Sequence, residues 1–398
     1  LRIKTMSEIK QHWQKIELNE ILSISSKKFN PISNNENKKC VELEHLSQET
    51  GKLLGYTNSS EQQSIKNSFE EGQILFGKLR PYLKKFWKAE FEGVCSSEIW
   101  VMNGKKVKND FLFYLVQTEK FNQIANVSSG SKMPRADWNY MSEIPFDIPP
   151  LKEQEKIAEI LTTWDEAITK QTELLRAKEL QKKALMQKLL SGEVRFDGFS
   201  DKWEEVRIDK LFDFKKGQEL SKEKLEKNGI FECILYGELY TTYSEVISEI
   251  KSKTNIKEGI KSKIDDILIP ASTTTSAIDL AIASTIQKDN VLIGGDINIL
   301  RKKTNNINGE FISKYLTHIK KMEIAKYAQG ITIIHLYSKD FKHLKIQLPS
   351  LQEQQKIAEV LSLADDEINL LKNELEELKL QKKALMQKLL TGEVRVKV

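Results

Sequence analysis

The stretch that decides the fold is LKEQEKIAEIL…LQKKALMQKLLSGEVR, Leu151–Arg195, which recurs without a gap as LQEQQKIAEVL…LQKKALMQKLLTGEVR, Leu351–Arg395. Counted from Pro149 and Pro349, 27 of 47 positions are identical at an offset of 200, and the block Leu180–Leu190 is unchanged in the second copy. A repeat of this length has to be recognised before any other pattern is interpreted. Two half-molecules in series suit a target that also has two halves, and duplex DNA is the commonest such target.

Each copy carries an apolar seam of period 3.5, in which steps of four and three residues alternate as a coiled coil requires. Polar members weaken this seam at Gln171, Lys178, Lys182 and Lys382, but they help to fix its register. We expect the seam to form the interface between the two helices or between subunits. Its other members are Ile157, Leu161, Trp164, Ile168, Leu175, Leu185 and Leu189 in the first copy, and Ile357, Leu361, Ala364, Ile368, Leu371, Leu375, Leu378, Leu385 and Leu389 in the second.

Punctuating residues set the bounds of both helices. Pro149-Pro150 and Pro349 mark the starts, because proline breaks an incoming element and is tolerated in a first helical turn. Gly192 and Gly392 follow the last seam residues, where a left-handed cap is expected. Each helix of about 40 residues would be roughly 60 Å long. Since neither can bury its stripe alone, we expect the two to pair. Symmetry favours an antiparallel pair, whereas a parallel pair would crowd both globular segments at one end.

The repeat divides the chain into a first globular domain (residues 1–148), a first repeat helix (149–192), a second globular domain (193–348), and a second repeat helix with a C-terminal tail (349–398). The expected fold class is α/β (α+β), with two globular domains joined and spaced by two long antiparallel coiled-coil helices in pseudo-twofold symmetry. Both domains open on similar segments, WQKIELNEI from Trp13 and WEEVRIDKL from Trp203, and diverge afterwards. A shared scaffold with different working surfaces is expected if each half recognises something different.

Short apolar runs predict the strands of these domains, and longer periodic runs predict the helices. We expect helices over Asp110–Asn126 and Glu310–Lys326. The expected strands are Gln73–Phe76, Ile99–Met102 and Phe146–Ile148 in the first domain, and Ile267–Ile269, Ala281–Ile286, Val291–Ile293 and Ile297–Leu300 in the second.

Composition sets bounds on the class of protein. The formal net charge of the 398 residues is +5, which permits nucleic-acid binding without demanding it. No apolar run approaches the roughly 20 residues of a membrane span, and no apolar core of a signal peptide is evident. The three scattered cysteines predict reduced thiols, so we expect a cytoplasmic protein.

The motifs of catalysis are missing from the sequence. Gly72–Leu79 imitates a phosphate-binding loop, but leucine stands where a Mg²⁺-binding Ser or Thr is needed. We find no base-methylation motif, no glycine-rich cofactor loop and no clear nuclease carboxylate cluster. The five histidines are not grouped for metal binding. We therefore expect no catalytic residue, metal or cofactor in this chain, although carboxylate sites are hard to exclude from sequence alone.

Cations, hydroxyls and aromatic residues gather in segments that we expect to contact DNA, since Arg can read guanine and Lys mostly neutralises phosphate. A solvated turn is the alternative for each segment. The candidates in the first domain are Lys27, Lys28, Lys78, Arg80, Tyr82, Lys84, Lys85, Ser129, Gly130, Ser131, Lys132 and Arg135. Those in the second are Lys215, Lys216, Gln218, Tyr236, Tyr240, Tyr243, Ser272, Thr273, Thr274, Thr275, Gly330, Thr332 and His335.

Proline followed by Leu-x-Glu-Gln-x-Lys-Ile-Ala-Glu-Ile/Val-Leu, and a long helix closing in QKKALMQKLL(S/T)GEVR, resembles the repeat helices of specificity (S) subunits of type I restriction–modification enzymes. The resemblance covers the whole chain as two target-recognition domains, each followed by a helix. FGKLRPY from Phe76 and YGELY from Tyr236 also resemble stretches of such domains, less specifically.

The resemblance implies that each domain binds one half of a split DNA site in the major groove, and that an antiparallel helix pair spaces the half-sites. It further implies partners that serve defence against foreign DNA: two methyltransferase (M) subunits, which bring S-adenosylmethionine for adenine methylation, and two ATP- and Mg-dependent restriction (R) subunits that join through them. None of that catalysis would belong to this chain.

Two alternatives of other classes stay open. One is a coiled-coil assembly or adaptor protein whose globular heads bind protein partners and are indifferent to DNA. The other, a self-contained methylase–nuclease, is disfavoured because its motifs are absent and the chain is short.

Overall fold

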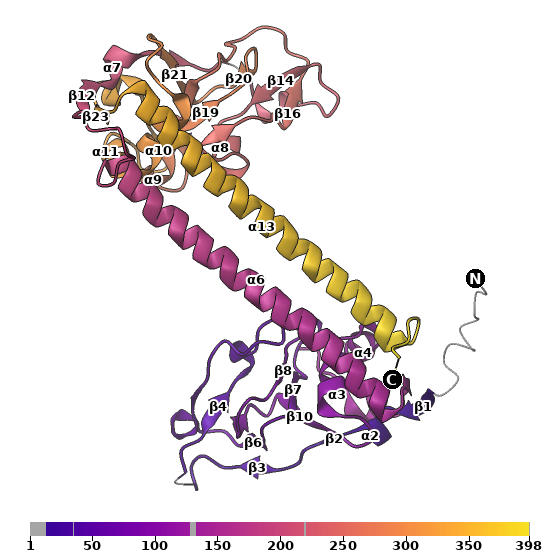
Figure 1. Ribbon diagram of the computed structural model, residues 1–398. Helices are drawn as coiled ribbons and strands as arrows, with labels where there is room; N and C mark the ends of the chain where they lie inside the picture. Colours follow the sequence, from indigo (N-terminus) through magenta and orange to yellow (C-terminus); the bar gives the residue numbers. More distant parts are fainter. Residues whose placement is uncertain (1–12, 35, 128–132, 219, 398) are drawn as a thin grey trace. The chain divides into compact units, whose positions relative to one another are not determined.

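A computed structural model describes residues 13–34, 36–127, 133–218 and 220–397. The chain forms two compact units, one of Leu1–Glu173 with Asn373–Val398 and the other of Leu174–Lys372. Each unit therefore holds one globular domain, the start of the repeat helix that follows this domain, and the end of the other repeat helix (Figure 1). The two units are described separately.

The repeat helices are α6 (Leu151–Ser191) and α13 (Leu351–Thr391). They begin two residues after Pro149 and Pro349, and each is followed by a glycine with positive φ, 73° at Gly192 and 72° at Gly392. The predicted starts and the left-handed caps are thus confirmed. None of the twenty seam positions, all of which lie in the described part of the chain, is exposed. The period of 3.5 in the sequence therefore marks the faces that the helices bury.

Within each unit the two helix segments run antiparallel. In the first unit Asp165 of α6 pairs with Lys382 of α13. Gln171, six residues after Asp165, pairs with Glu374, which lies eight residues before Lys382. In the second unit the ion pairs are Lys178–Glu367 and Lys182–Asp365. The partner's number falls as the helix advances, which confirms the antiparallel prediction. Lys182 and Lys382, polar members of the seam, hold its register through these aspartates.

The first domain is built from two main sheets and a short ribbon. One sheet runs in the order β2 (Leu22–Ile24), β10 (Ile99–Gly104), β7 (Ile74–Gly77), β8 (Phe86–Lys88), with antiparallel neighbours. The other runs β3 (Lys28–Phe29), β6 (Lys66–Phe69), β9 (Gly93–Cys95), β4 (Lys39–Val41), β5 (Thr57–Asn58), and β4 and β9 are parallel. β1 (Gln14–Glu17) and β11 (Pro145–Ile148) form the ribbon. The helical elements are η1 (Leu43–His45), η2 (Ser59–Glu61), η3 (Pro81–Leu83), α2 (Leu18–Ile21), α3 (Asn109–Leu115), α4 (Glu119–Ala125) and α5 (Trp138–Ser142).

The second domain repeats the scaffold with different details. Its largest sheet runs β13 (Phe212–Lys216), β21 (Ile297–Lys302), β17 (Asp266–Pro270), β19 (Ser284–Ile286), β15 (Val246–Ile247). Smaller groups are β16 (Ser252–Thr254), β14 (Phe231–Ile234) and β20 (Leu292–Ile293), and the pairs β18 (Ser272–Thr273) with β22 (Ile334–His335) and β12 (Glu204–Arg207) with β23 (Lys345–Leu348). The helical elements are η4 (Lys222–Lys224), α7 (Ile208–Leu211), α8 (Glu238–Thr241), α9 (Ala277–Leu280), α10 (Gly309–His318), α11 (Lys321–Ala325) and α12 (Ser338–Phe341).

The domain starts that resemble each other in sequence fold alike. Each forms a short strand, β1 or β12, and then one helical turn, α2 or α7. Each strand pairs antiparallel with the last strand before its repeat helix, β11 or β23. The ribbon therefore brings the two ends of each domain together at the base of the helix.

Three sequence predictions need correction. Asp110–Asn126 is not one helix but α3 and α4, because Thr118 caps α4 by accepting a hydrogen bond from the backbone N–H of Phe121. Glu310–Lys326 is likewise divided into α10 and α11. The strand predicted over Ala281–Ile286 begins only at Ser284, because Ala281 still caps the helical turn α9. The other predicted strands are present, within a residue or two at their ends.

Each core joins a domain to both helices. In the first unit Ile157 and Leu161 of α6 and Leu389 of α13 are buried with α3, α4 and the β2-β10-β7-β8 sheet. In the second unit the equivalent residues Ile357, Leu361 and Leu189 are buried with α10 and the β13 sheet. Burial of apolar surface at this joint stabilises each domain on its pair of helix ends.

Candidate nucleic-acid interface

In the first domain the fold joins two segments that the sequence separates by more than fifty residues. β7 ends at Gly77, and the chain then runs beside the segment around Arg135. Leu79 forms an antiparallel bridge with Arg135, the Arg80 N–H donates to Pro134 O at 2.8 Å, and the Ala136 N–H donates to Lys78 O at 2.9 Å. Cationic candidates from both segments therefore lie on one ribbon.

Arg80 is the cation of this ribbon that is best placed to meet a ligand. It is exposed, and no described acidic side chain lies within ion-pair distance of its guanidinium group. Its backbone is left-handed, with φ of 52°, and Lys84 at the far end of η3 has φ of 46°. Such conformations cost non-glycine residues about 1–3 kcal/mol and cluster at functional sites. Tyr82 lies between them with 53% of its surface exposed.

Three other candidate cations, Arg135, Lys84 and Lys85, are engaged within the first domain. Arg135 makes a bidentate pair with Glu98 at 3.0 and 3.2 Å, and this hydrogen bonding and charge raise the pKa of the guanidinium. Lys84 pairs with Glu49 at 2.9 Å, and Lys85 Nζ donates to Leu43 O at 2.6 Å. DNA contacts from these residues would require exchange of their present partners.

The remaining candidates of this domain fall into two groups. Lys27 pairs with Glu70 at 2.7 Å, and Lys28 donates to Asn67 at 2.6 Å. Lys28 lies on β3 and Lys27 just before it, at the edge of the other sheet, so they are not part of the ribbon around Arg80. Ser129, Gly130, Ser131 and Lys132 lie outside the described residues.

In the second domain the candidates meet around β18. Ser272 faces His335 and Thr273 faces Ile334 in the β18–β22 pair. The hydroxyl of Tyr240 donates to Ser272 O at 2.7 Å, and Ser272 Oγ donates to Asp296 at 3.1 Å. Lys216, at the end of β13, pairs with Asp296 at 3.3 Å, so it belongs to the same cluster. Segments from five parts of the sequence thus form one polar cluster, but Ser272 and Thr273 themselves are buried, with 6% and 8% of their surfaces exposed.

Several hydroxyls of this cluster have internal partners. Tyr243 Oη accepts from the Lys251 N–H, and Thr275 Oγ1 donates to Asp279. Burial raises the pKa of the Tyr240 phenol. The more exposed candidates are Lys215, Gln218, Tyr236, Thr274, Gly330 and Thr332.

Sequence analysis missed a polar joint that recurs in both units. In the first unit Glu153 is buried, accepts from Trp13 Nε1 at 3.2 Å and is held bidentately by Arg395 at 2.5 and 2.7 Å. In the second unit Glu353 does the same with Trp203 at 3.2 Å and Arg195 at 2.8 Å. These residues lie outside the apolar seam, yet each has an identical counterpart in the other half, and that identity is the signal that could have revealed them.

A second joint tethers each domain to the middle of its helices. Asp165 accepts from Lys382 at 2.6 Å and from the Tyr114 hydroxyl at 2.9 Å. Asp365 accepts from Lys182 and, at 2.9 Å, from the buried Lys314. Each aspartate therefore connects its own helix, the opposite helix and the domain.

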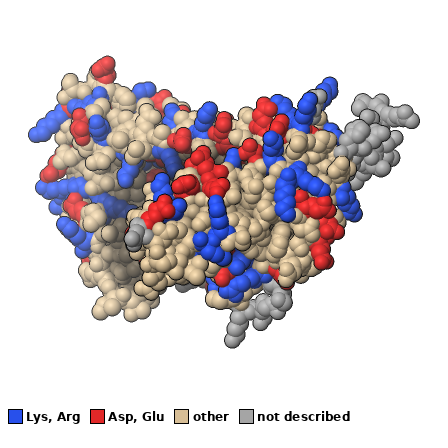
Figure 2. Space-filling model, turned by 90° about the horizontal axis from the view of Figure 1, so that it is seen from below, with Lys and Arg blue, Asp and Glu red and all other residues tan. Residues whose placement is uncertain are grey.

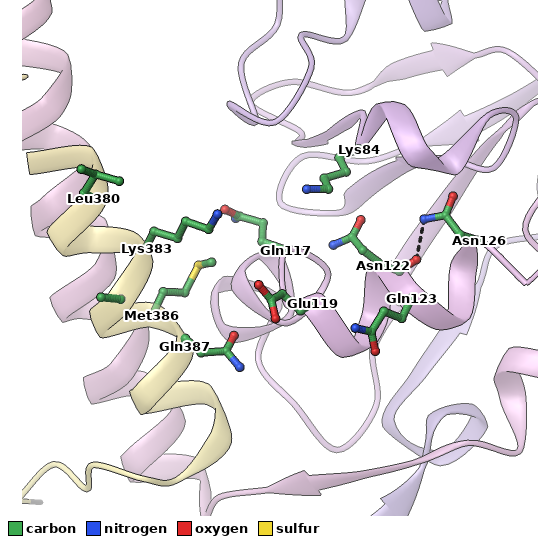
Figure 3. Close-up of a pocket in the computed structure, with 11 residues that line it drawn as sticks. Lys84, Gln117, Glu119, Asn122, Gln123, Asn126, Leu380, Lys383, Met386 and Gln387 are labelled. Carbon is green, nitrogen blue, oxygen red and sulfur yellow. Dashed lines mark hydrogen bonds between the residues drawn. The ribbon is translucent and has the colours of Figure 1, made fainter. Parts of the chain in front are cut away.

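A pocket of about 720 Å³ lies in the first unit between α4 and the last turns of α13. Figure 3 shows the amides and Glu119 of the domain side facing Lys383, Met386 and Gln387 of the helix. The domain side is lined by Lys84, Gln117, Glu119, Asn122, Gln123 and Asn126. Its helix wall includes part of the block that is identical in the two repeats.

On the face that Figure 2 shows, Lys and Arg are interspersed with Asp and Glu. No group of His, Cys, Asp and Glu suited to hold a metal ion is found among the described residues. Within the same residues, no helix combines the length and apolar character needed to cross a membrane. The arrangement offers binding surfaces, one on each domain, mounted on equivalent helical joints.

The two halves of the chain are thus equivalent α/β domains on equivalent helical joints, with different loops. The model of the type I restriction modification DNA specificity domain matches residues 10–177 and again residues 200–380. The chain therefore belongs to this family, and each of its halves contains one DNA specificity domain.

Relatives support the same family. The EcoDI specificity subunit of Escherichia coli is 32% identical over 201 residues, which are 48% of this chain and only 45% of that protein. The putative MjaX specificity subunit of Methanocaldococcus jannaschii is 26% identical over 425 residues, 98% of this chain and 96% of that protein.

Solved structures show the same fold at low identity. The HsdS subunit from Thermoanaerobacter tengcongensis has a TM-score of 0.52 and 19% identity, covering 96% of this chain and 97% of that one. The S subunit from M. genitalium has a TM-score of 0.59 and 18% identity, covering 95% and 96%. The two-domain architecture with long helices is thus that of solved specificity subunits.

Proposed function

We propose that this chain is the non-catalytic DNA-specificity subunit of a type I restriction–modification complex, in which each domain reads one half of an asymmetric bipartite site in the major groove. One observation carries the proposal: the same DNA-specificity family matches both halves, whose helical joints are equivalent while their surface loops differ. Equivalent joints would orient the domains alike, and different loops would read different bases. An adaptor with protein-binding heads is not favoured, because it gives no reason for two DNA specificity domains.

The helix pair would set the spacing of the half-sites. Each helix has 41 residues, and its start and end belong to different units. A helix of this length extends about 60 Å at 1.5 Å per residue. Duplex DNA rises about 34 Å per turn, so a spacer of roughly one turn or more is compatible with this length.

Two M subunits would dock on the repeated helix ends. Leu180 and Leu380, whose surfaces are 69% and 66% exposed, are identical in the two copies, as are the exposed positions Lys183 and Lys383 nearby. Seam packing does not require identity at exposed positions, and only 3 of the 18 positions over residues 162–179 are identical to their counterparts. A face that is unchanged at both ends suits two copies of one partner.

The cofactors would reside in those partners. This chain would hold none, whereas M subunits would bring S-adenosylmethionine for adenine methylation. Two R subunits would join through the M subunits and use ATP and Mg²⁺. The complex would work on DNA in the cytoplasm of a bacterium or archaeon.

The test is to co-express this chain with its cognate M subunit in a host free of adenine methylation and to map modified adenines across the genome. We expect one asymmetric bipartite motif that disappears when this chain is omitted. A co-purified complex that binds no DNA, and leaves no motif, would contradict the proposal.

A further inference from the structure

A short hairpin of the second domain runs from Gln329 to His335 and includes β22. Gln329 and His335 exchange backbone hydrogen bonds of 2.8 and 2.7 Å across its base. Gly330 has φ of 130°, and a Cβ at this position would lie 2.0 Å from Ile333 O, so no other residue fits without distortion. The bend at the start of the tip is therefore one that glycine adopts and a side chain would disturb.

The hairpin is fixed to the domain on its C-terminal side. The Leu336 side chain is fully buried, its N–H donates to Ala271 O at 2.9 Å, and its carbonyl accepts from Asn298 Nδ2 at 2.9 Å. β22 pairs with β18, so the hairpin base adjoins Ser272 and Thr273. The tip is thus anchored beside the polar cluster around β18.

The tip itself is apolar. Ile331 is 100% exposed and Ile333 is 50% exposed, so no described part of the chain covers Ile331. Single exposed aliphatic residues are common and need no explanation by themselves. Here the residue stands at the end of an anchored ribbon. On the C-terminal side of this ribbon the rings of His335 and Tyr337 stack, with their centroids 5.6 Å apart, and the Lys339 ammonium group lies over the Tyr337 ring.

Resting on the DNA-reading function proposed above, we propose that Ile331 reads a thymine in the half-site of the second domain by packing on its 5-methyl group. The major groove, about 12 Å wide, admits a two-stranded ribbon. The thymine methyl is the apolar feature of base-pair edges in that groove, and an aliphatic tip recognises it without hydrogen bonds. Ile331 is thus a specificity residue that complements the polar candidates near it, the exposed Thr274 and the half-buried His335.

The test uses the purified complex of this chain with its M subunit, and duplexes that carry the half-sites mapped by methylation. Each thymine of the second half-site is replaced in turn by deoxyuridine, which removes only the methyl group. We expect one replacement to weaken binding about fourfold, the effect of losing one buried methyl contact. The Ile331→Ala variant should bind the unmodified duplex about as weakly and should no longer respond to that replacement.

A matched control is Ile230→Ala, which alters another isoleucine of the same domain, 78% exposed and in a different loop. This variant should bind like the wild type and keep its response to deoxyuridine. Thermal melting of each variant checks that the fold is intact.

The proposal is overturned if wild-type binding is unaffected by every deoxyuridine replacement, or if the Ile331→Ala variant still responds to the replacement. Loss of M-subunit association in Ile331→Ala would assign the tip to a protein partner instead. Failure of the wild-type complex to bind any DNA would refute the DNA-reading function itself.

Discussion

At the scale of single residues, the structure separates the cations that hold the fold from those available to a ligand. In the sequence, Lys84, Arg135 and Arg80 are equivalent candidates, because all three lie in segments where cations, hydroxyls and aromatic residues gather. Their partners could not be predicted, since Glu49 and Glu98 approach through tertiary contacts. Arg80 is the exposed member without an acidic partner among the described residues, so it is the best candidate base reader of the first domain.

Arg80→Ala tests that assignment. We expect it to weaken recognition of only the half-site read by the first domain, by about 1–3 kcal/mol if Arg80 contacts a base. Binding to duplexes with single changes in either half-site measures the effect, and Lys85→Ala serves as a control because Lys85 Nζ is bonded to Leu43 O. An equal loss for both half-sites would speak against the assignment.

The two equivalent aspartates give a matched comparison inside one chain. Asp365→Ala leaves the ammonium group of Lys314 buried without its partner, whereas Asp165→Ala leaves the neutral Tyr114 hydroxyl, which also contacts Thr162 at 3.0 Å. Removing one partner of a buried ion pair costs about 3–5 kcal/mol, and losing a neutral hydrogen bond about 1 kcal/mol.

We therefore expect Asp365→Ala to destabilise the protein by roughly 2 kcal/mol more than Asp165→Ala. Hydrogen exchange of α10 and α3 in the two variants is the measurement, because it reports each unit separately. Adding Lys314→Met to Asp365→Ala should restore much of the loss. Equal protection in both single variants would show that Lys314 does not depend on Asp365.

At the scale of elements, helices were easier to predict than the contacts between loops. The alternation of four and three residues in the seam depends only on local sequence, and every seam position is at least partly buried. The break between α3 and α4 was signalled by Thr118, a residue suited to cap a helix, but the apolar periodicity on either side concealed it. The β18–β22 pair and the Leu79–Arg135 bridge join distant segments of different sequence in the two domains, so no repeat revealed them.

The exposed face at the helix ends leads to a prediction about assembly. Leu180→Glu and Leu380→Glu should each weaken association of one M subunit by about tenfold or more, because a charge replaces an apolar contact at the interface. The double variant should lose both M subunits while keeping its thermal stability, since both leucines are exposed.

Leu363→Glu is the control for this face. Leu363 is 60% exposed on α13, but its counterpart in the first copy is Thr163. Size-exclusion chromatography with light scattering counts the M subunits bound to each variant. Normal assembly of the double variant would place the docking surface elsewhere.

At the scale of the whole molecule, the internal repeat explains why one chain can present two different recognition surfaces. Glu153 with Arg395 and Glu353 with Arg195 form equivalent joints from residues that are identical in the two halves. The scaffold was therefore predictable from the repeat, because both halves must meet the same packing requirements. The bases recognised were not, because the reading loops share little beyond a glycine such as Gly330.

The spacing role of the helices yields the last prediction. Seven residues inserted after Glu173 and seven after Asn373 would extend both helices by two turns and preserve the seam period of 3.5. These positions match because the hydrogen bond from Gln171 to Glu374 places them close to opposite each other in the antiparallel pair of the first unit. The added length is about 10 Å at 1.5 Å per residue, which corresponds to about three base pairs of duplex.

We expect the methylated motif to keep both half-sites and to gain spacer length. An insertion in one helix alone should abolish methylation, because it shifts Lys182 or Lys382 away from its aspartate. A double insertion that leaves the spacer unchanged would show that the helices do not set the distance between half-sites.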